Sequence, residues 1–104
     1  MNACNIGMSL IYVCHPFRGD PVGNAARVTA ICRQIVKDGD CPVGPPVYLP
    51  LFVHDEETAM RCCLALLEAC DEVRVYGEQI TAGMRAEIDH ARERSIQVRW
   101  MNPA

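Results

Sequence analysis

The chain has 104 residues, a formal net charge of -3 and a hydrophobic fraction of 50%. This length predicts a single domain over residues 1–104, and this composition excludes intrinsic disorder and low-complexity sequence. The acidic balance argues against a nucleic-acid polymer as the main ligand, because acidic residues interrupt the densest basic run, residues 85–99. A single nucleotide remains compatible with it.

The cysteine content indicates the compartment. Seven cysteines occur, an odd number without any Cys-x-x-Cys pair, and most fall inside apolar runs. We therefore expect buried free thiols and a cytoplasmic protein. The N-terminus lacks a basic n-region, and the apolar run of residues 8–14 is too short for a signal sequence or a membrane span. No Cys or His spacing matches the usual zinc ligand pairs, so neither a metal nor a cofactor is expected.

The first part of the chain predicts a strand, a loop and a helix. Residues 8–14 are nearly all apolar, which is typical of a strand buried on both faces of a parallel sheet. Turn-forming residues dominate the loop of residues 15–21. From about residue 22, apolar residues recur at spacings of three, four and seven, and this pattern predicts a helix that stops at Asp38 and Gly39.

The middle of the chain is less regular. Prolines interrupt residues 41–50, so this segment predicts at most a short strand at a sheet edge, where a missing N–H group is tolerated. A second helix is predicted from the apolar stripe of residues 59–70, which follows acidic residues that suit the N-terminal end of a helix dipole. Within that stripe, Cys63 is interpreted as a packing residue.

The last third predicts a strand, a helix and a strand. Residues 71–76 form a short run with β-branched and aromatic side chains that closes at Gly77. Thr81 is the expected N-cap of a helix that runs to about Ser95, and residues 96–100 form the final strand.

One carboxylate on that third helix is the main functional candidate. Glu87 lies beside Ile88 and three residues after Met84, at the edge of the buried stripe. Its side chain is expected to point back toward the strand–turn junction, where it could face a ligand. The alternative is a solvent-facing helix carboxylate.

Alternating strands and helices predict an α/β fold of the flavodoxin or Rossmann type. We expect a small doubly wound parallel sheet of about four strands in the order 2-1-3-4, with helices on both faces. Ligands of such sheets bind outside the carboxyl ends of the strands, at the switch point between strands one and three. Residues 15–19 and 77–83 flank that point, so the two most polar loops should meet there.

Four features together suggest a family. They are the first strand and its loop, Ile-Tyr-Val-Cys-His-Pro-Phe-Arg-Gly at residues 11–19, then Asn24, the pair Cys70 and Asp71, and the run Thr-Ala-Gly-Met-Arg-Ala-Glu-Ile-Asp-His-Ala at residues 81–91. Their order and spacing resemble the nucleoside 2-deoxyribosyltransferase-like superfamily, especially its short, mostly uncharacterised and often phage-borne members. The likeness covers most of the chain.

The resemblance implies roles for particular residues. Glu87 would be the nucleophile on the anomeric carbon of the sugar, and Thr81 would match a serine that touches a 5′-phosphate in the nucleotide-hydrolysing branch. The second acidic residue of the catalytic members falls at Cys63, eight positions before Asp71. A thiol donates a proton to a departing base less readily than a carboxylic acid does.

A set of further residues is predicted to contact the substrate, and most of them have a structural alternative. The alternatives are loop polarity for His15 and Arg18, a helix cap for Asn24, a core position for Tyr12 and relief of crowding for Gly83. The predicted substrate-binding residues are Tyr12, His15, Pro16, Phe17, Arg18, Asn24, Tyr76, Gly77, Thr81, Gly83 and Met84.

Three functional hypotheses follow. The first is an N-glycosidase or 2-deoxyribosyltransferase that acts on a nucleoside or nucleoside monophosphate through Glu87. The second is a non-catalytic protein that binds a nucleotide or an ADP-ribose-like ligand, motivated by Cys63. The third is a structural interaction module. Because a chain of this size leaves apolar helix surface, a homodimer is also expected.

Overall fold

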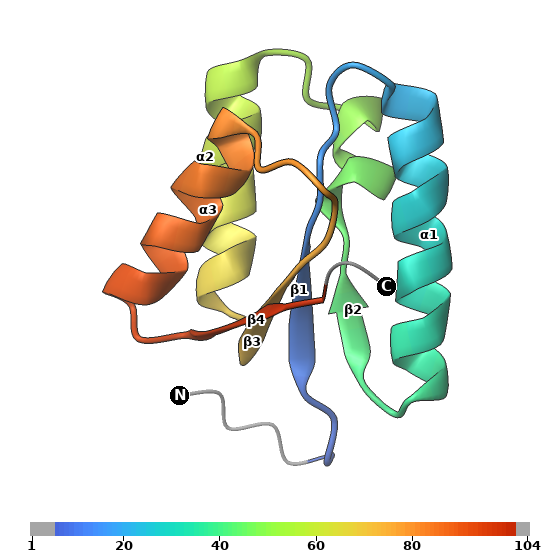
Figure 1. Ribbon diagram of the computed structural model, residues 1–104, viewed down its shortest axis with the longest axis vertical. Coiled ribbons are helices and arrows are strands. Elements are labelled where there is room, and N and C mark those ends of the chain that lie inside the picture. Colours follow the sequence, from blue (N-terminus) through green and yellow to red (C-terminus); the bar gives the residue numbers. More distant parts are fainter. Residues whose placement is uncertain (1–5, 102–104) are drawn as a thin grey trace.

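The computed structural model describes residues 6–101 and contains one parallel sheet (Figure 1). The sheet order is β2-β1-β3-β4, and every neighbouring pair of strands is parallel. This confirms the predicted order and the predicted Rossmann-like sheet. The strands are β1 (Leu10–Cys14), β2 (Cys41–Val43), β3 (Glu72–Val75) and β4 (Gln97–Trp100).

Helices cover both faces of the sheet, as predicted. The helix α1 (Pro21–Lys37) lies on one face, and α2 (Glu56–Glu68) and α3 (Ala82–Glu93) lie side by side on the other (Figure 1). Two short 3-10 turns, η1 (Pro45–Val47) and η2 (Leu49–Leu51), connect β2 to α2. The sequence prediction treated this connection as an irregular, proline-broken segment.

The central strand β1 supplies side chains to both layers of the core. Ile11 and Val13 pack with Val28 and Ile35 of α1, whereas alternate residues of the strand pack with α2 and α3. Each fully buried side chain of this size stabilises the fold by about 1.5–3 kcal/mol. Burial on both faces therefore explains the continuous apolar run and fixes the orientation of Tyr12.

All three helices begin at the carboxyl ends of the strands, and each begins with a side-chain cap. The carboxylates of Asp20 and Asp55 accept hydrogen bonds from the backbone N–H groups of Gly23 and Thr58, at 3.1 Å and 2.9 Å. The hydroxyl of Thr81 accepts one from the N–H of Met84 at 3.1 Å, which confirms Thr81 as an N-cap.

The cysteines are less uniformly buried than expected. The six described cysteines are free thiols, and only Cys14 and Cys70 are buried, while the other four are partly exposed. Cys4 lies outside the described residues. Across residues 6–101, no helix is both long and apolar enough to cross a bilayer, and no three potential metal-binding side chains of Cys, His, Asp or Glu cluster.

Candidate active site

A cleft with a volume of about 770 Å³ opens at the carboxyl ends of the strands. Its walls come from the loop after β1, from η1 and η2, and from the N-terminal turns of α2 and α3, which meet at one end of the molecule (Figure 1). A site at this edge is where the topology of the sheet predicts one.

Glu87 lies at the floor of the cleft. Glu87 is 8% exposed, and its carboxylate accepts hydrogen bonds from two side chains of β1. The hydroxyl of Tyr12 donates to Oε2 at 2.7 Å, and the thiol of Cys14 donates to Oε1 at 3.3 Å. Glu87 is therefore a held, inward-facing carboxylate and not a solvated one on the helix surface.

Burial dominates the electrostatics of this carboxylate. Desolvation raises the pKa of Glu87, while hydrogen bonds from Tyr12, Cys14 and Cys63 act in the opposite direction. Burial and the neighbouring Glu87 charge raise the pKa of Tyr12 well above its usual range. The same two causes raise the pKa of Cys14. The two hydrogen-bond donors therefore keep their protons, and a negative charge at the cleft floor resides on Glu87.

Cys63 is a third ionisable side chain beside Glu87. It comes from α2, lines the cleft, and interacts with both Tyr12 and Glu87. Burial raises the pKa of its thiol to about 11, so the thiol is protonated near neutral pH. Cys63 packs against the core cluster, as predicted, and it also lines the cleft.

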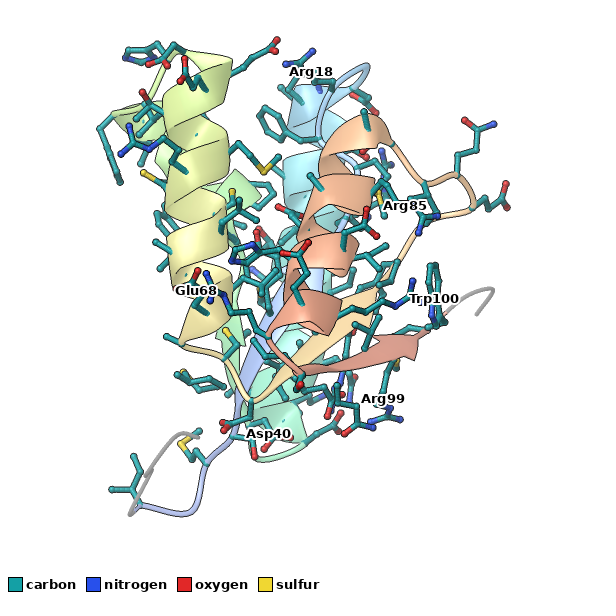
Figure 2. All side chains as sticks on the ribbon, turned by 90° about the vertical axis from the view of Figure 1, so that its left-hand side faces the viewer. Arg18, Asp40, Glu68, Arg85, Arg99 and Trp100 are labelled. Atoms are coloured by element: carbon teal, nitrogen blue, oxygen red, sulfur yellow. The ribbon has the colours of Figure 1, made fainter. Side chains whose placement is uncertain are left out.

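The mouth of the cleft carries opposite charges. Arg18, in the loop after β1, forms an ion pair with Glu56 at the start of α2, and both side chains are largely exposed. Figure 2 shows Arg18 at the opposite end of the molecule from Asp40. The mouth also includes Asp55, Glu57 and His54.

The structure brings most of the predicted site residues together. Eight of them line the cleft: Tyr12, His15, Phe17, Arg18, Thr81, Gly83, Met84 and Glu87. The remaining four, Pro16, Asn24, Tyr76 and Gly77, are not among its lining residues. Each of these four residues is close in sequence to a residue that lines the cleft, but its own side chain or backbone contacts other parts of the protein.

Asn24 and Tyr76 have structural roles behind the cleft wall. The Asn24 amide donates hydrogen bonds to the carbonyl oxygens of Phe17 and Arg18, at 2.9 Å and 3.5 Å, and so holds their loop. It does not cap α1, because Asp20 does. Tyr76 packs on the α1 side of the sheet, contrary to the expectation that its ring reaches the crevice. The strand alternates, so position 76 lies on the face opposite to Val75.

Gly77 and Pro16 contact each other where the two polar loops meet. Gly77 has a φ of +104°, and a Cβ atom there would lie 2.9 Å from Cδ of Pro16. Only glycine combines this backbone conformation with this close approach. These two residues therefore shape the loops and do not form the cleft surface.

Sequence reasoning missed half of the cleft wall. The segment from Pro45 to Val53 and the first turns of α2 face Glu87 across the cavity. The only signal in the sequence was the density of prolines in residues 42–50, which favours fixed turns over a strand. Nothing local indicated that these turns would pack over the end of the sheet.

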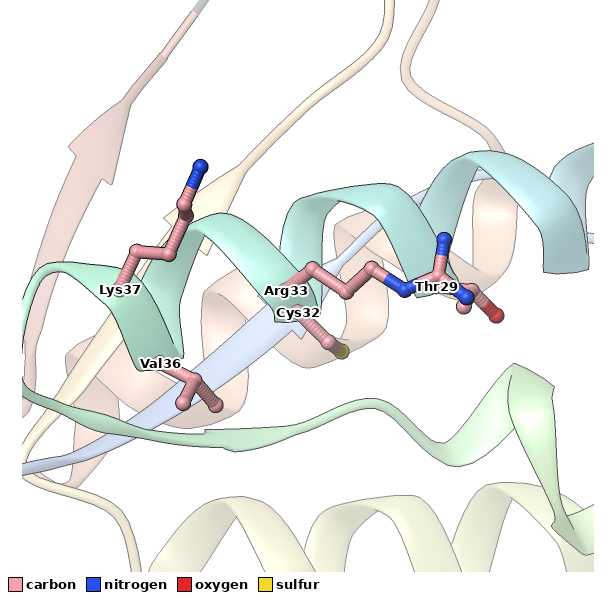
Figure 3. A pocket seen from close by; sticks show the side chains of 5 residues that line it. All are labelled: Thr29, Cys32, Arg33, Val36 and Lys37. Carbon is pink, nitrogen blue, oxygen red and sulfur yellow. The ribbon is translucent and has the colours of Figure 1, made fainter.

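A second hollow, of about 540 Å³, lies on the surface of α1. Figure 3 shows its five lining residues, Thr29, Cys32, Arg33, Val36 and Lys37, which all come from this one helix. The Thr29 hydroxyl is already bonded to the carbonyl oxygen of Ala25, at 2.9 Å. No set of polar groups converges there, so we place the candidate site in the cleft around Glu87.

Comparisons with known proteins bear on this cleft. Residues 9–101 match the family described as "Domain of unknown function (DUF7768)". The chain belongs to this family. No curated protein matches this DUF7768 member. Among solved structures, it is similar to a 2-desoxiribosyltransferase from Leishmania mexicana, with a TM-score of 0.71 and 13% identity. The match covers 88% of this chain and 63% of the other, so the two share a fold while this chain spans less than two thirds of the other.

Proposed function

We propose that this protein is an N-glycosidase or 2-deoxyribosyltransferase-like enzyme that acts on a nucleoside or nucleoside monophosphate. The observation that carries the proposal is a buried carboxylate, Glu87, at the floor of a cleft and hydrogen-bonded by Tyr12 at 2.7 Å. The shared fold with a 2-desoxiribosyltransferase supports a related chemistry.

The size and lining of the cleft suit a nucleoside. A volume of about 770 Å³ lies within the range of small-molecule sites, roughly 300–1,000 Å³. Apolar side chains such as Phe17, Leu49 and Met60 dominate the wall, and a few polar groups punctuate it. Such a lining can bury a base while the polar groups orient the sugar.

In the proposed reaction, an oxygen of Glu87 attacks C1′ of the sugar, and the bond from C1′ to the base nitrogen breaks. A glycosyl ester of Glu87 forms, and water or a second base then displaces the carboxylate. The Tyr12 hydroxyl holds Oε2 and the Cys14 thiol holds Oε1, and a remaining lone pair of the carboxylate attacks the sugar. The desolvated environment keeps Glu87 poorly hydrated, which favours attack.

The mouth of the cleft supplies groups for a phosphate. The backbone N–H groups of Ala82 and Gly83 at the start of α3 can bind an anion, whereas that of Met84 is already bonded to Thr81. The guanidinium of Arg18 can pair with the same anion through two parallel hydrogen bonds. Arg18 would exchange Glu56 for the phosphate. A nucleoside monophosphate would then lie with its sugar over Glu87.

Base release from a panel of nucleosides and nucleotides, followed by chromatography, tests the proposal. Glu87→Gln should lower the rate by at least about 100-fold, because it removes the nucleophile. Asp89→Asn is the matched control, since Asp89 is exposed on the same helix. Absence of base release from every substrate, or an unchanged rate in Glu87→Gln, would refute the proposal that the protein is an enzyme with Glu87 as its nucleophile.

A second candidate function is capture of a nucleotide or ADP-ribose-like ligand without cleavage. The position of Cys63 beside Glu87 favours it, because a thiol with a pKa of about 11 is a weak acid for releasing a base. A thermal-shift screen followed by mass spectrometry of the eluted ligand separates the two functions. An intact ligand supports capture, and a cleaved one supports the enzyme.

A homodimer is proposed for the assembled protein. Leu51 and Phe52 are 79% and 64% exposed, and their neighbours Pro50 and Val53 line the cleft. Exposed apolar side chains that are contiguous in sequence suit a subunit interface. Light scattering over a range of concentrations should give twice the mass of the chain, and a constant monomer mass would contradict this.

A further inference from the structure

We infer that the cleft selects substrates whose leaving group departs without receiving a proton, namely N-glycosides of a positively charged base. This inference rests on the proposed function and narrows its substrate class. A ribosyl pyridinium and a 7-alkylated purine nucleoside belong to this class. Two features of the cleft favour such substrates: the proton donors beside Glu87 are poor acids, and the lining carries more acidic than basic side chains.

The need for a proton depends on the base. When the bond from C1′ to a neutral base breaks, the electron pair stays on nitrogen and gives an anion, which must be protonated. When the base is cationic, the same electron pair neutralises the ring, and no proton is needed. A positioned general acid is worth about 100- to 10,000-fold in rate for a neutral base and little for a cationic one.

The donors closest to Glu87 are poor acids. Tyr12 already donates its proton to Glu87, at 2.7 Å, and its loss would place a phenolate against a carboxylate. The thiol of Cys63 lines the cleft beside both groups, with a pKa raised to about 11 by burial. Neither group releases a proton readily near neutral pH.

His15 is also directed away from this task. Its Nδ1 atom lies 2.7 Å from the carbonyl oxygen of Pro16. A carbonyl oxygen can only accept, so the hydrogen on Nδ1 points to the carbonyl of Pro16. This hydrogen of His15 is therefore engaged within its own loop and is not directed at a departing base.

Two carboxyl groups at the mouth already have partners. Asp55 accepts a hydrogen bond from the backbone of Thr58, which lowers its pKa, and Glu56 is paired with Arg18. With Glu57 and Glu87, four carboxylates line the cleft against one guanidinium. This excess of negative charge favours a cationic ligand over a neutral one.

The reaction balances without an internal acid. A Glu87 oxygen bonds to C1′ as the bond from C1′ to the cationic nitrogen breaks, and the base leaves neutral. Water then attacks C1′, the bond to Glu87 breaks, and the water proton passes to solvent. The products are the free sugar, the neutral base and a proton.

A matched pair of substrates tests the inference. Guanosine and 7-methylguanosine differ by one methyl group and one positive charge, and their 5′-monophosphates extend the pair. The unmodified protein should cleave the methylated member at least about 100-fold faster. The ratio of the rate on 7-methylguanosine to the rate on guanosine should fall as pH is lowered below about 6, because a proton from solution assists only the departure of the neutral base.

A variant of the cleft distinguishes selectivity caused by the protein from the intrinsic difference in reactivity between the two substrates. Cys63→Asp should raise guanosine cleavage by about 10-fold or more and leave the rate on 7-methylguanosine no higher. Cys62→Asp, the neighbouring position on α2 outside the cleft lining, should not change the ratio. Equal cleavage of both substrates by the unmodified protein, or parallel pH profiles, would overturn the inference while leaving the glycosidase standing. Absence of cleavage of either class would overturn both.

Discussion

The hydroxyl of Tyr12 lies 2.7 Å from Oε2 of Glu87, although 75 positions separate the two residues. Tyr12 comes from the central strand β1 and Glu87 from the second turn of α3, so the contact joins the sheet to the helix layer. Packing on the central strand fixes the position of the tyrosine side chain. The carboxylate that it holds is therefore preorganised in one orientation.

Tyr12→Phe removes this hydrogen bond and keeps the ring. A hydrogen bond to a charged group contributes about 1.5–3 kcal/mol, so kcat/KM should fall by roughly 10- to 100-fold. The pKa of Glu87 should also rise further, because the Tyr12 hydroxyl lowers it, and the acidic limb of the pH–rate profile should move to higher pH. Tyr76→Phe, on the other face of the sheet, is the control. An unmoved acidic limb in Tyr12→Phe would show that the hydroxyl does not hold the carboxylate.

Glu87 should also affect stability in a pH-dependent way. Its pKa is raised above 4.5 in the folded chain, so the folded state binds the proton more tightly than the unfolded state. The contribution of Glu87 to the free energy of unfolding is therefore greatest below about pH 4.5, falls as pH rises to the raised pKa, and is constant above it. Glu87→Gln lacks this loss, so the stability difference, variant minus unmodified protein, should increase across that window.

Urea denaturation at a series of pH values measures this difference. Asp89→Asn serves as the control, because its exposed carboxylate has no such burial. A difference between Glu87→Gln and the unmodified protein that does not vary with pH would mean that the carboxylate titrates alike in both states.

Two glycines should respond in opposite ways to alanine. At Gly83 a Cβ atom would make only ordinary contacts, with Cε of Met60 at 3.5 Å and Oγ1 of Thr81 at 3.9 Å. Gly83→Ala should therefore preserve stability or raise it by up to about 1 kcal/mol. The added methyl group would still narrow the cleft, and KM should rise by about 10-fold. Relief of crowding is therefore not what requires glycine there.

Gly77→Ala is the contrasting variant. Its φ of +104° and the approach to Pro16 should make the substitution destabilising by about 1–3 kcal/mol. Thermal unfolding and substrate titration of both variants measure the two effects. A destabilised Gly83→Ala with unchanged KM would contradict the placement of Gly83 in the cleft wall.

Arg18 should distinguish a nucleotide from a nucleoside. Its ion pair with Glu56 is exposed, so Arg18→Ala should change stability by less than about 1 kcal/mol. KM should rise by about 10-fold for a nucleoside monophosphate and stay unchanged for the nucleoside, because only the former has a phosphate to bind. Arg33→Ala, on α1 away from the cleft, is the control. An equal effect of Arg18→Ala on both substrates would contradict the proposal that Arg18 binds the phosphate.

Helical periodicity predicted the orientation of Glu87, because the apolar stripe on α3 places it at the edge of the buried face. The continuous apolar run of β1 predicted that Tyr12 is buried but not which face of the sheet it lies on. Tyr76 shows the limit of this reasoning. It sits at a strand end, where sequence position suggested the crevice, but the alternation of the strand directs its ring to the α1 side.

The opposite wall could not be predicted for a different reason. The turns of residues 45–51 are placed by tertiary packing: a Cβ at Gly44 would lie 2.9 Å from Cys32 and Val28 of α1. No local pattern encodes that contact. Cys63 was likewise ambiguous, because a half-buried position at the edge of an apolar stripe can face either the core or a cavity.

The placement of Tyr12 and Cys14 on β1 has a consequence for how destabilising mutations affect activity. This strand is paired on both sides and covered on both faces, so its amide protons should exchange with solvent only when the whole domain opens. The groups that hold Glu87 therefore cannot loosen by themselves. A mutation elsewhere that weakens folding should reduce the number of competent molecules without changing the turnover of those that remain.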